Sequence, residues 1–341
     1  MGKFDGKVAV ITGGGKGGGI GYGLSTAFAK EGCDLVITGR NTRKLDDARE
    51  ELERLYGVKV LACQADGGVE EQVAGVVKQA ADTFGRIDFL INNAQNSASG
   101  VPLAEHTKED FDKAVYSGLY AVFFYMKHAY PYLKQARGSV VNFASGAGLF
   151  GKPGQSSYAA AKEGIRGMTR VAATEWGPDG INCNCICPLV MTDALKKWKE
   201  EYPAVYEQTI KGIPAGRFGD PEKDIGRTAV FLCSEDAKYI SGETITMQGG
   251  SGQLDFDVNY QLNYAVKNVA RDIPQFSFNT AVARIMELVN AMYKYMDGQP
   301  DAAFLKEAAK KLCLLLAPFA PHFAEEMWSR LGGEYSIFNQ D

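Results

Sequence analysis

Short apolar runs alternate with amphipathic stretches from the start of the chain to about residue 250. The first run is Val8–Ile11, and a helical pattern over residues 22–30 follows it after a glycine-rich turn. The later runs with strand character are Leu35–Thr38, Lys59–Cys63, Phe89–Asn92 and Ser139–Phe143. Apolar strands that alternate with helices are typical of a parallel sheet covered on both faces. The pattern therefore predicts an α/β fold with a doubly wound parallel sheet.

The alternation ends at Gly249-Gly250-Ser251-Gly252, a composition typical of a flexible hinge. Beyond it, apolar residues recur at three- and four-residue steps over residues 278–292 and 305–316, and Pro318 and Pro321 interrupt the second run. This periodicity predicts helices only. We therefore expect two domains, an α/β domain over residues 1–252 and a small α-helical domain over residues 253–341.

Composition and charge exclude some classes of protein and some partners. The chain has 341 residues, of which 45% are hydrophobic and 23% charged, and this mix excludes a disordered or fibrous protein. The net charge is −4, and residues 253–341 hold 8 basic and 11 acidic side chains. Neither part has the cationic character that phosphate backbones require, so nucleic acid is not the expected main partner.

The seven cysteines have no framework spacing, and the chain shows neither a signal-peptide pattern nor an apolar stretch long enough to span a membrane. We therefore expect a reduced, cytoplasmic protein. Cys183, Cys185 and Cys187 alternate, which favours one face of a buried strand over a zinc site, because no histidine lies near them. No metal ligand is predicted.

A glycine-rich turn, Thr12-Gly13-Gly14-Gly15-Lys16-Gly17-Gly18-Gly19-Ile20-Gly21, links the first strand to the first helix. Glycines let the backbone approach a pyrophosphate, and the helix N-terminus favours the anion. We therefore expect a Rossmann-like domain that binds a dinucleotide. The candidate contacts are Thr12, Gly13, Gly19, Ile20 and Gly21; two registers are open, so the role of each glycine stays undecided.

The end of the second strand indicates which nicotinamide cofactor fits. NAD-binding folds place an acidic residue on the ribose about 20 residues after the glycine turn. Here that strand ends in Gly39-Arg40, and Asp34 lies at its start. An arginine suits a 2′-phosphate, and Lys16 would add charge. We expect NADP(H) to be preferred, with NAD(H) possible if Arg40 is only a solvated surface residue.

Three polar residues form a candidate catalytic set. Tyr158 and Lys162 are four residues apart on one helix face, and Ser145 follows the strand that ends at Phe143. A neighbouring ammonium favours the phenolate and would lower the pKa of Tyr158 from about 10. The serine hydroxyl could orient a carbonyl or an alcohol beside the phenol, so the set predicts proton transfer during carbonyl reduction or alcohol oxidation.

Together these motifs resemble the short-chain dehydrogenase/reductase family over about residues 4–252. The further matches are Asp66, Asn92-Asn93-Ala94, Pro188, Thr192, Ile240–Ile245 and Gly249-Gly250. The resemblance implies that Tyr158 is the general acid/base, that Lys162 modulates its pKa and binds the ribose, and that Ser145 orients the substrate. It also implies cofactor contacts from Asp66 at the adenine, from Asn93 and Ala94, and from Pro188 and Thr192 near the nicotinamide.

Some positions depart from the family pattern. Gly118 stands where related enzymes carry an asparagine that completes a proton relay through water, and Ser117 beside it is an alternative site for that water. Gln95 replaces the glycine after Asn92-Asn93-Ala94, Leu189 replaces the glycine after Pro188, and Thr192 comes one residue early. These departures predict an unusual pocket while leaving the serine, tyrosine and lysine in place.

The C-terminal segment resembles the helical anticodon-binding domain of leucyl-tRNA synthetase. The matching stretches are Phe276–Ala281, Leu314–His322, Ala324–Trp328 and Leu331–Gly333. Motifs for aminoacylation do not occur in the sequence. Because the segment is acidic, tRNA is an unlikely partner, and a helical appendage that caps the reductase or mediates assembly is the favoured interpretation.

We therefore predict an oxidoreductase that prefers NADP(H) and interconverts a ketone and a secondary alcohol. Gly216–Glu222 resembles the branch that reduces 3-oxoacyl thioesters, and aromatic residues between Thr192 and Arg217 suit a bulky apolar substrate; a steroid, a sugar or another ketone stays open. The resemblance implies a homodimer or homotetramer. The alternative hypothesis is a reductase-shaped scaffold or tRNA-binding protein without catalysis.

Overall fold

The computed structural model describes residues 2–339 except residues 18, 99, 252–261, 263–264, 267, 271, 275–277, 297–300 and 335. It divides into two compact units, each described by itself below. The first comprises Met1–Tyr206 and Arg217–Gly249, and the second comprises Glu207–Gly216 and Gly250–Asp341. The predicted domain boundary at 252/253 lies outside the described residues.

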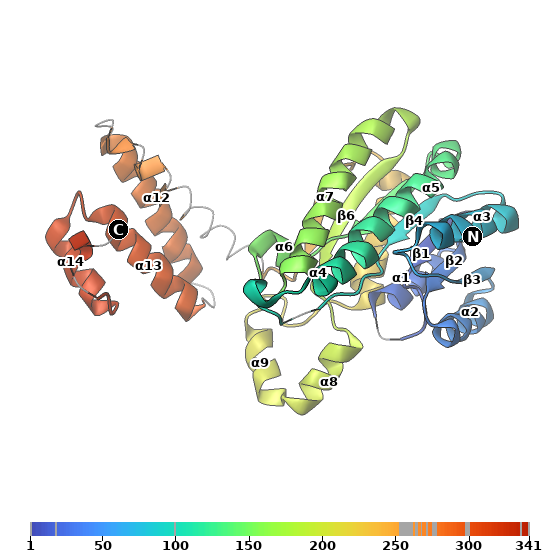
Figure 1. The fold of residues 1–341 in the computed structure, drawn as a ribbon, viewed down its shortest axis with the longest axis horizontal. Helices are drawn as coiled ribbons and strands as arrows, with labels where there is room; N and C mark the ends of the chain where they lie inside the picture. Colours follow the sequence, from blue (N-terminus) through green and yellow to red (C-terminus); the bar gives the residue numbers. More distant parts are fainter. Residues whose placement is uncertain are drawn as a thin grey trace. The chain divides into compact units, whose positions relative to one another are not determined.

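A seven-stranded parallel sheet forms the centre of the first unit, with the strand order β3-β2-β1-β4-β5-β6-β7 (Figure 1). The strands are β1 (Val8–Thr12), β2 (Asp34–Gly39), β3 (Val60–Gln64), β4 (Phe89–Asn92), β5 (Ser139–Phe143), β6 (Asn182–Pro188) and β7 (Thr244–Met247). Five of these coincide with the apolar runs of the sequence to within two residues. The predicted parallel sheet is confirmed.

Helices cover both faces of this sheet, as the two-sided burial of the strands requires. Ala9 and Ile11 of β1 point to one core, which the helices α1 (Ile20–Lys30), α2 (Thr42–Tyr56) and α10 (Arg227–Cys233) complete. Val8 and Val10 point to the other core, which is completed by α3 (Glu70–Phe84), α5 (Ala121–Ala136) and α7 (Ser156–Trp176). The doubly wound architecture predicted from the sequence is therefore present.

Shorter elements connect these layers. Helix α4 (Lys108–Ala114) continues through a π-helical segment, η2 (Val115–Tyr120), into α5. The other helices are α6 (Gly146–Phe150), α8 (Asp193–Glu201) and α9 (Pro203–Lys211), and a second π-helical segment, η4, spans Pro221–Gly226. Single 3₁₀ turns occur at Leu103–Glu105, Gly177–Asp179 and Glu235–Ala237, and another, Ile337–Asn339, lies in the second unit.

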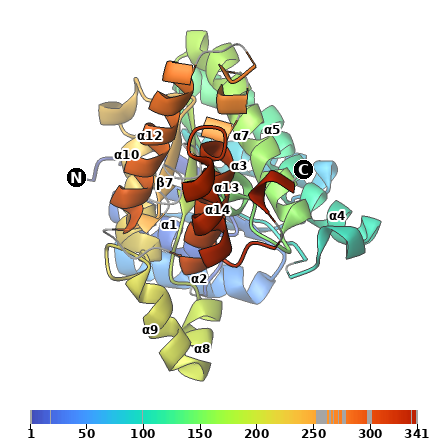
Figure 2. The same cartoon turned by 90° about the vertical axis from the view of Figure 1, so that its left-hand side faces the viewer.

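The second unit is helical in its described residues. It contains α12 (Phe278–Met296), α13 (Ala302–Leu316) and α14 (Pro321–Arg330), shown in orange and red in Figure 2. Leu288 and Met292 of α12 pack with Ala308 of α13, so the apolar stripes read from the sequence form this core. Pro321 begins α14, because a proline is tolerated in the first helical turn.

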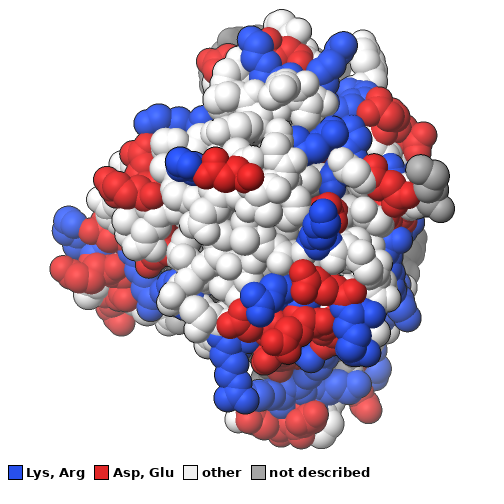
Figure 3. Space-filling model, turned by 90° about the vertical axis from the view of Figure 1, so that its right-hand side faces the viewer, with Lys and Arg blue, Asp and Glu red and all other residues white. Residues whose placement is uncertain are grey.

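The structure shows where the cysteines lie and how charged side chains are distributed on one face. Cys183, Cys185 and Cys187 are free and buried in one core on β6, as the alternation predicted. Among the described residues, no set of three or more His, Cys, Asp and Glu side chains could hold a metal ion, and no helix is long and apolar enough to cross a membrane. On the face drawn in Figure 3, basic and acidic side chains lie in mixed groups around a broad central area without charged residues.

Candidate active site

A cavity of about 420 Å³ opens at the carboxyl ends of β1 and β4, where the strand order reverses. Open parallel sheets bind ligands at this kind of position. A second hollow, of about 280 Å³, shares Gly13, Thr38, Gly39 and Arg40 with the first. The predicted cofactor residues that line the larger cavity are Thr12, Gly13, Ile20, Arg40, Asp66, Asn93, Ala94 and Thr192. Lys16 and Gly19 line the smaller one.

The structure shows at which positions of the turn only glycine fits. Gly13 has a left-handed backbone with φ of +73°, and a Cβ there would lie 3.0 Å from Asn93 Nδ2. A Cβ on Gly21 would overlap the carbonyl oxygen of Gly13, so only glycine lets α1 start this close to β1. Gly19 is the N-cap residue of α1 and faces open space. This close turn beside a helix N-terminus fits a pyrophosphate.

Hydrogen bonds of Thr12 connect the glycine-rich turn to the loop that follows β4. Its Oγ1 accepts hydrogen bonds from the backbone N–H groups of Asn93 at 2.9 Å and Ala94 at 3.0 Å. The side-chain amide of Asn93 donates in return to the Thr12 carbonyl at 3.1 Å. Three predicted cofactor residues are therefore held in one rigid arrangement at the cavity wall.

Arg40 and Asp66 lie at the far end of the cavity. Arg40 is exposed and pairs with no acidic side chain among the described residues. Asp66 Oδ1 accepts a hydrogen bond from the N–H of Gly68 at 2.9 Å. Lys16 forms an ion pair with Glu51, which lowers the pKa of that carboxyl.

Lys44 lines the smaller hollow beside Arg40, and the sequence analysis did not single it out. Its position in the first turn of α2, four residues after Arg40, was the available signal. A Cβ on Gly17 would lie 3.8 Å from Lys44 Nζ, so this ammonium reaches the glycine-rich turn. With Lys16, three basic side chains therefore border the hollow.

Ser145, Tyr158 and Lys162 come together as predicted. Ser145 is the N-cap residue of α6 and forms a side-chain hydrogen bond with Tyr158 of α7. Lys162 lies one helical turn after Tyr158, with Nζ 5.5 Å from the centre of the phenol ring. Lys162 Nζ donates a hydrogen bond of 2.6 Å to the Phe143 carbonyl at the end of β5. These three residues and Pro188 are not among the residues described as lining the two hollows.

The electrostatics of Tyr158 differ from the prediction. Burial raises the pKa of Tyr158 above its ordinary value, and the hydrogen bond with Ser145 only partly opposes this. Burial also lowers the pKa of Lys162 to about 8. The predicted lowering of the pKa of Tyr158 was wrong, because desolvation raises that pKa by more than the hydrogen bond from Ser145 lowers it. A buried phenol of this kind is a proton donor near neutral pH.

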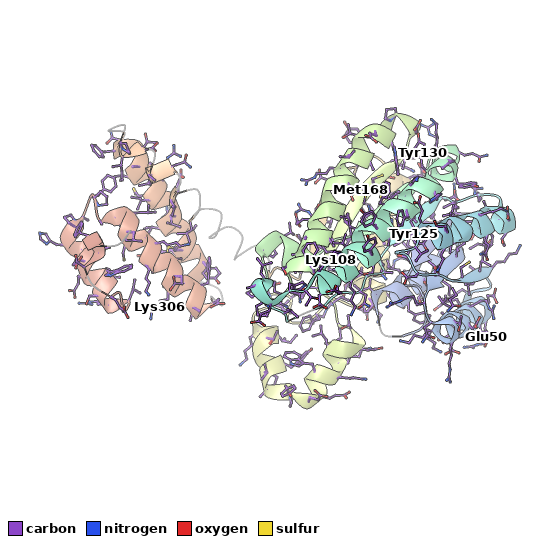
Figure 4. The ribbon with its side chains drawn as sticks, in the orientation of Figure 1. Glu50, Lys108, Tyr125, Tyr130, Met168 and Lys306 are labelled. Carbon is purple, nitrogen blue, oxygen red and sulfur yellow. The ribbon has the colours of Figure 1, made fainter. Side chains whose placement is uncertain are left out.

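Ser117 does not offer a free hydroxyl to a water. Its Oγ lies 2.7 Å from the Asn96 carbonyl and 2.5 Å from the Lys113 carbonyl, and it accepts the Asn96 N–H at 3.0 Å. Tyr125, which the sequence analysis missed, is buried on α5 and lines the cavity (Figure 4). Its hydroxyl donates to Thr38 Oγ1 at 3.3 Å, and burial raises its pKa to about 12.

Comparison with known proteins identifies the family of this fold. A model of the short-chain type, described as enoyl-(acyl carrier protein) reductase, matches residues 14–251. The chain belongs to the short-chain dehydrogenase/reductase family. It is 62% identical over 257 residues to a 12alpha-hydroxysteroid dehydrogenase from a Clostridium species, covering 74% of this chain and 99% of that relative. The predicted oxidoreductase class is confirmed.

More distant relatives have other substrates. A 3-oxoacyl-[acyl-carrier-protein] reductase from Thermotoga maritima is 34% identical over 73% of this chain and 98% of its own length. The crystal structure of levodione reductase superposes with a TM-score of 0.68 at 33% identity, covering 73% of this chain and 98% of that one. NAD+-bound xylitol dehydrogenase has a TM-score of 0.67 at 28% identity, covering 73% and 100%. Family membership alone therefore fixes neither substrate nor cofactor.

The C-terminal segment matches a different model, described as the anticodon-binding domain of tRNA ligase, over residues 255–341. This match agrees with the resemblance read from the sequence. It covers a separate part of the chain from the reductase match, and the two ranges do not overlap.

Proposed function

We propose that this enzyme is a hydroxysteroid dehydrogenase that interconverts a 12α-hydroxyl and a 12-ketone and prefers NADP(H). The observation that carries the substrate assignment is the 62% identity to a 12alpha-hydroxysteroid dehydrogenase over 99% of that relative's length. The 3-oxoacyl reductases, in contrast, share only about a third of their residues with this chain.

The site residues support the chemistry of that reaction. Bound nicotinamide would accept the hydride during oxidation and supply it during reduction. In oxidation, Tyr158 takes the hydroxyl proton while the carbon loses its hydride; in reduction, Tyr158 returns a proton to the carbonyl oxygen. Ser145 holds the phenol oxygen and the substrate oxygen in one place, and Lys162 would bind the ribose with its buried ammonium.

The cofactor preference rests on two basic residues. Arg40 and Lys44 border the hollow at the end of β2, and Arg40 is free of acidic partners among the described residues. A ribose 2′-phosphate would be held there by charge-assisted hydrogen bonds. The predicted contribution of Lys16 is weakened by its ion pair with Glu51. The cofactor contacts predicted for Gly13, Ile20, Asp66, Asn93 and Thr192 fit the same bound position.

An assay of the purified protein tests the substrate. A 12α-hydroxysteroid with NADP+ is expected to yield reduced nicotinamide, and the 12β epimer is the matched control that presents the same ring system with the hydroxyl reversed. A 3-oxoacyl thioester with NADPH tests the second candidate, which the Gly216–Glu222 stretch favours. Turnover of the thioester without turnover of the steroid would replace the proposed substrate.

We also propose that residues 1–252 form the catalytic domain and residues 253–341 an appendage. The hydroxysteroid relative, matched over 99% of its length, covers only 74% of this chain, so a related protein of that length exists without the appendage. A chain ended after residue 252 is expected to keep its specific activity. Loss of activity with the fold intact would assign the appendage a part in catalysis.

Self-association and a cytoplasmic location complete the proposal. Exposed aromatic side chains follow the α4–η2–α5 face, and Tyr116 and Tyr120 stack there with ring centres 5.0 Å apart. An apolar face of this kind suits a second copy of the chain in a homodimer or homotetramer. Sedimentation of wild type and of Tyr120→Glu tests this, because a charge on the face should shift the enzyme toward monomer. The proposed cytoplasmic location is supported by the seven free cysteines, because thiols stay reduced in that compartment.

A further inference from the structure

The glycine-rich turn rests on the first turn of α2. The backbone N–H of Lys16 donates a hydrogen bond of 2.7 Å to the Lys44 carbonyl. A Cβ on the preceding Gly15 would lie 3.3 Å from the Lys44 backbone, so the two segments are in close contact. Lys16, Lys44 and Arg40 line the same small hollow. The backbone of Lys16 is therefore fixed beside the hollow that we propose for the ribose 2′-phosphate.

The side chain of Lys16 extends along α2 to Glu51, with which its ammonium forms an ion pair. Glu51 comes seven residues after Lys44 and lies on the same face of that helix. A rise of 1.5 Å per residue places the two residues about 10 Å apart along the helix axis. Because a lysine carries its charge on a flexible four-carbon stem, the same backbone position can present the ammonium to Glu51 or to the hollow.

Glu51 has other partners besides Lys16. Tyr22 of α1 forms a side-chain hydrogen bond with the Glu51 carboxylate, and the charge of Arg54 also favours its ionised form. The hydrogen bond from Lys16 is the largest of the effects that lower the pKa of Glu51, so the carboxylate is charged at neutral pH. When Lys16 turns toward the hollow, Glu51 keeps the hydroxyl of Tyr22 as a donor.

A ribose 2′-phosphate would attract Lys16 more strongly than Glu51 does. The Lys16 side chain is 47% exposed and the Glu51 side chain 26%, and ion pairs between groups that water reaches are weak. A phosphate beside Arg40 and Lys44 would take charge-assisted hydrogen bonds from all three cations. NAD(H) carries a hydroxyl at this position and exerts no comparable attraction. The carboxylate of Glu51 therefore opposes the binding of one cofactor only.

We propose that Glu51 is a positioning residue that sets cofactor selectivity, because its carboxylate competes with the ribose 2′-phosphate for the ammonium of Lys16. Binding of NADP(H) exchanges the Glu51–Lys16 ion pair for a contact between Lys16 and the phosphate. Glu51 thus limits the affinity for NADP(H) and leaves that for NAD(H) unchanged. This inference rests on the proposed position of the 2′-phosphate, but it does not depend on the substrate.

The first test removes the charge of Glu51 and keeps its shape. Glu51→Gln is expected to bind NADPH about fivefold more tightly, which corresponds to about 1 kcal/mol, the upper end for an exposed ion pair. Its dissociation constant for NADH and its melting temperature should stay close to those of wild type. Glu50→Gln, which makes the same charge change at an exposed position of α2, is the matched control and should alter neither constant.

The second test separates release of Lys16 from a general effect of charge, and it does not depend on the first variant folding. Lys16→Met should weaken NADPH binding severalfold and leave NADH binding unchanged. Adding Glu51→Gln to Lys16→Met should then produce no tightening, because no ammonium is left to release. Calorimetric titration of the four proteins with both cofactors completes the cycle.

The outcomes separate this inference from the proposed cofactor preference. The ratio of the NADPH and NADH dissociation constants in wild type tests the preference, and the change of that ratio in Glu51→Gln tests the role of Glu51. A ratio that does not change in Glu51→Gln, or NADPH binding that is unaffected in Lys16→Met, would overturn the competition. Equal tightening by Glu51→Gln with and without Lys16 would also overturn it, because the carboxylate would then act by its field alone.

Discussion

The ammonium of Lys162 lies 5.5 Å from the ring centre of Tyr158 and is completely surrounded by protein, with one hydrogen bond to the Phe143 carbonyl. Burial favours the uncharged form of both groups. It raises the pKa of Tyr158 and lowers the pKa of Lys162 to about 8. The pair therefore favours a protonated phenol at neutral pH, the form that donates a proton during ketone reduction.

The direction of the reaction should consequently depend on pH. Alcohol oxidation needs the phenolate, so its kcat/KM is expected to rise with pH, and ketone reduction needs the phenol, so its kcat/KM is expected to fall at high pH. The Ser145 hydrogen bond lowers the pKa of Tyr158, so Ser145→Ala should move both profiles to higher pH besides reducing the rate. Profiles that stay in place in Ser145→Ala would show that another group titrates.

Lys162 is expected to reduce stability at neutral pH. Its pKa is about 8 in the folded chain, below the ordinary value of about 10.4, so the folded state disfavours the charged form by about 3 kcal/mol below pH 8. This penalty disappears as the pH rises from about 8 toward 10.4. Losing the hydrogen bond to the Phe143 carbonyl costs about 1 kcal/mol.

Lys162→Met should therefore be more stable than wild type at pH 7 by about 2 kcal/mol, with the gain lost toward pH 10, and it should be inactive. Urea unfolding at both pH values measures this. A variant that is less stable at both values would mean that the ammonium makes stabilising contacts that outweigh its desolvation.

Cofactor selection should depend on Arg40 and Lys44. Removing a charge-assisted hydrogen bond costs about 1.5–3 kcal/mol, so Arg40→Ala should weaken NADPH binding by about tenfold to a hundredfold and leave NADH binding nearly unchanged. Lys44→Ala should act in the same sense with a smaller effect. Calorimetric titration with both cofactors measures the ratio. Equal weakening of NADPH and NADH would place Arg40 away from the 2′-phosphate.

The close approach of Gly21 and Gly13 should show in stability. Gly21→Ala places a methyl group against the Gly13 carbonyl oxygen and is expected to cost about 3 kcal/mol. Gly75→Ala is the matched control, because Gly75 lies inside α3 with nothing within 4 Å of a Cβ, and alanine should stabilise that helix by up to about 1 kcal/mol. Thermal unfolding of both variants gives the comparison. Equal melting temperatures would contradict the close contact between Gly21 and the Gly13 carbonyl oxygen.

The sheet was predictable because its signal is local. Val8–Ile11 is apolar at every position, and Val140 and Val141 put apolar side chains on both faces of β5; a strand covered on two sides accounts for that pattern. The pairing of Ser145 with Tyr158 followed from spacing and the family motif. The electrostatics of Tyr158 did not follow, because desolvation depends on the packing of distant elements around the phenol.

Other features of the site needed the three-dimensional arrangement. Gln95 and Gly118 are separate departures in the sequence, and only the fold brings the end of β4 against the π-helical segment. The ion pair that occupies Lys16 likewise depends on Glu51 of α2. Lys44 was overlooked because its one signal was its position four residues after Arg40, inside a helix that carries many other charged residues.

Turnover and cofactor binding by Tyr158→Phe test the central claim most directly, namely that Tyr158 transfers the proton in a dehydrogenase site built with Ser145 and Lys162. The variant removes one hydroxyl and keeps the ring. We predict that kcat falls by about 10³-fold or more while the dissociation constant for NADPH changes less than about threefold. Turnover near the wild-type rate, with the cofactor still bound, would contradict the mechanism proposed for this site.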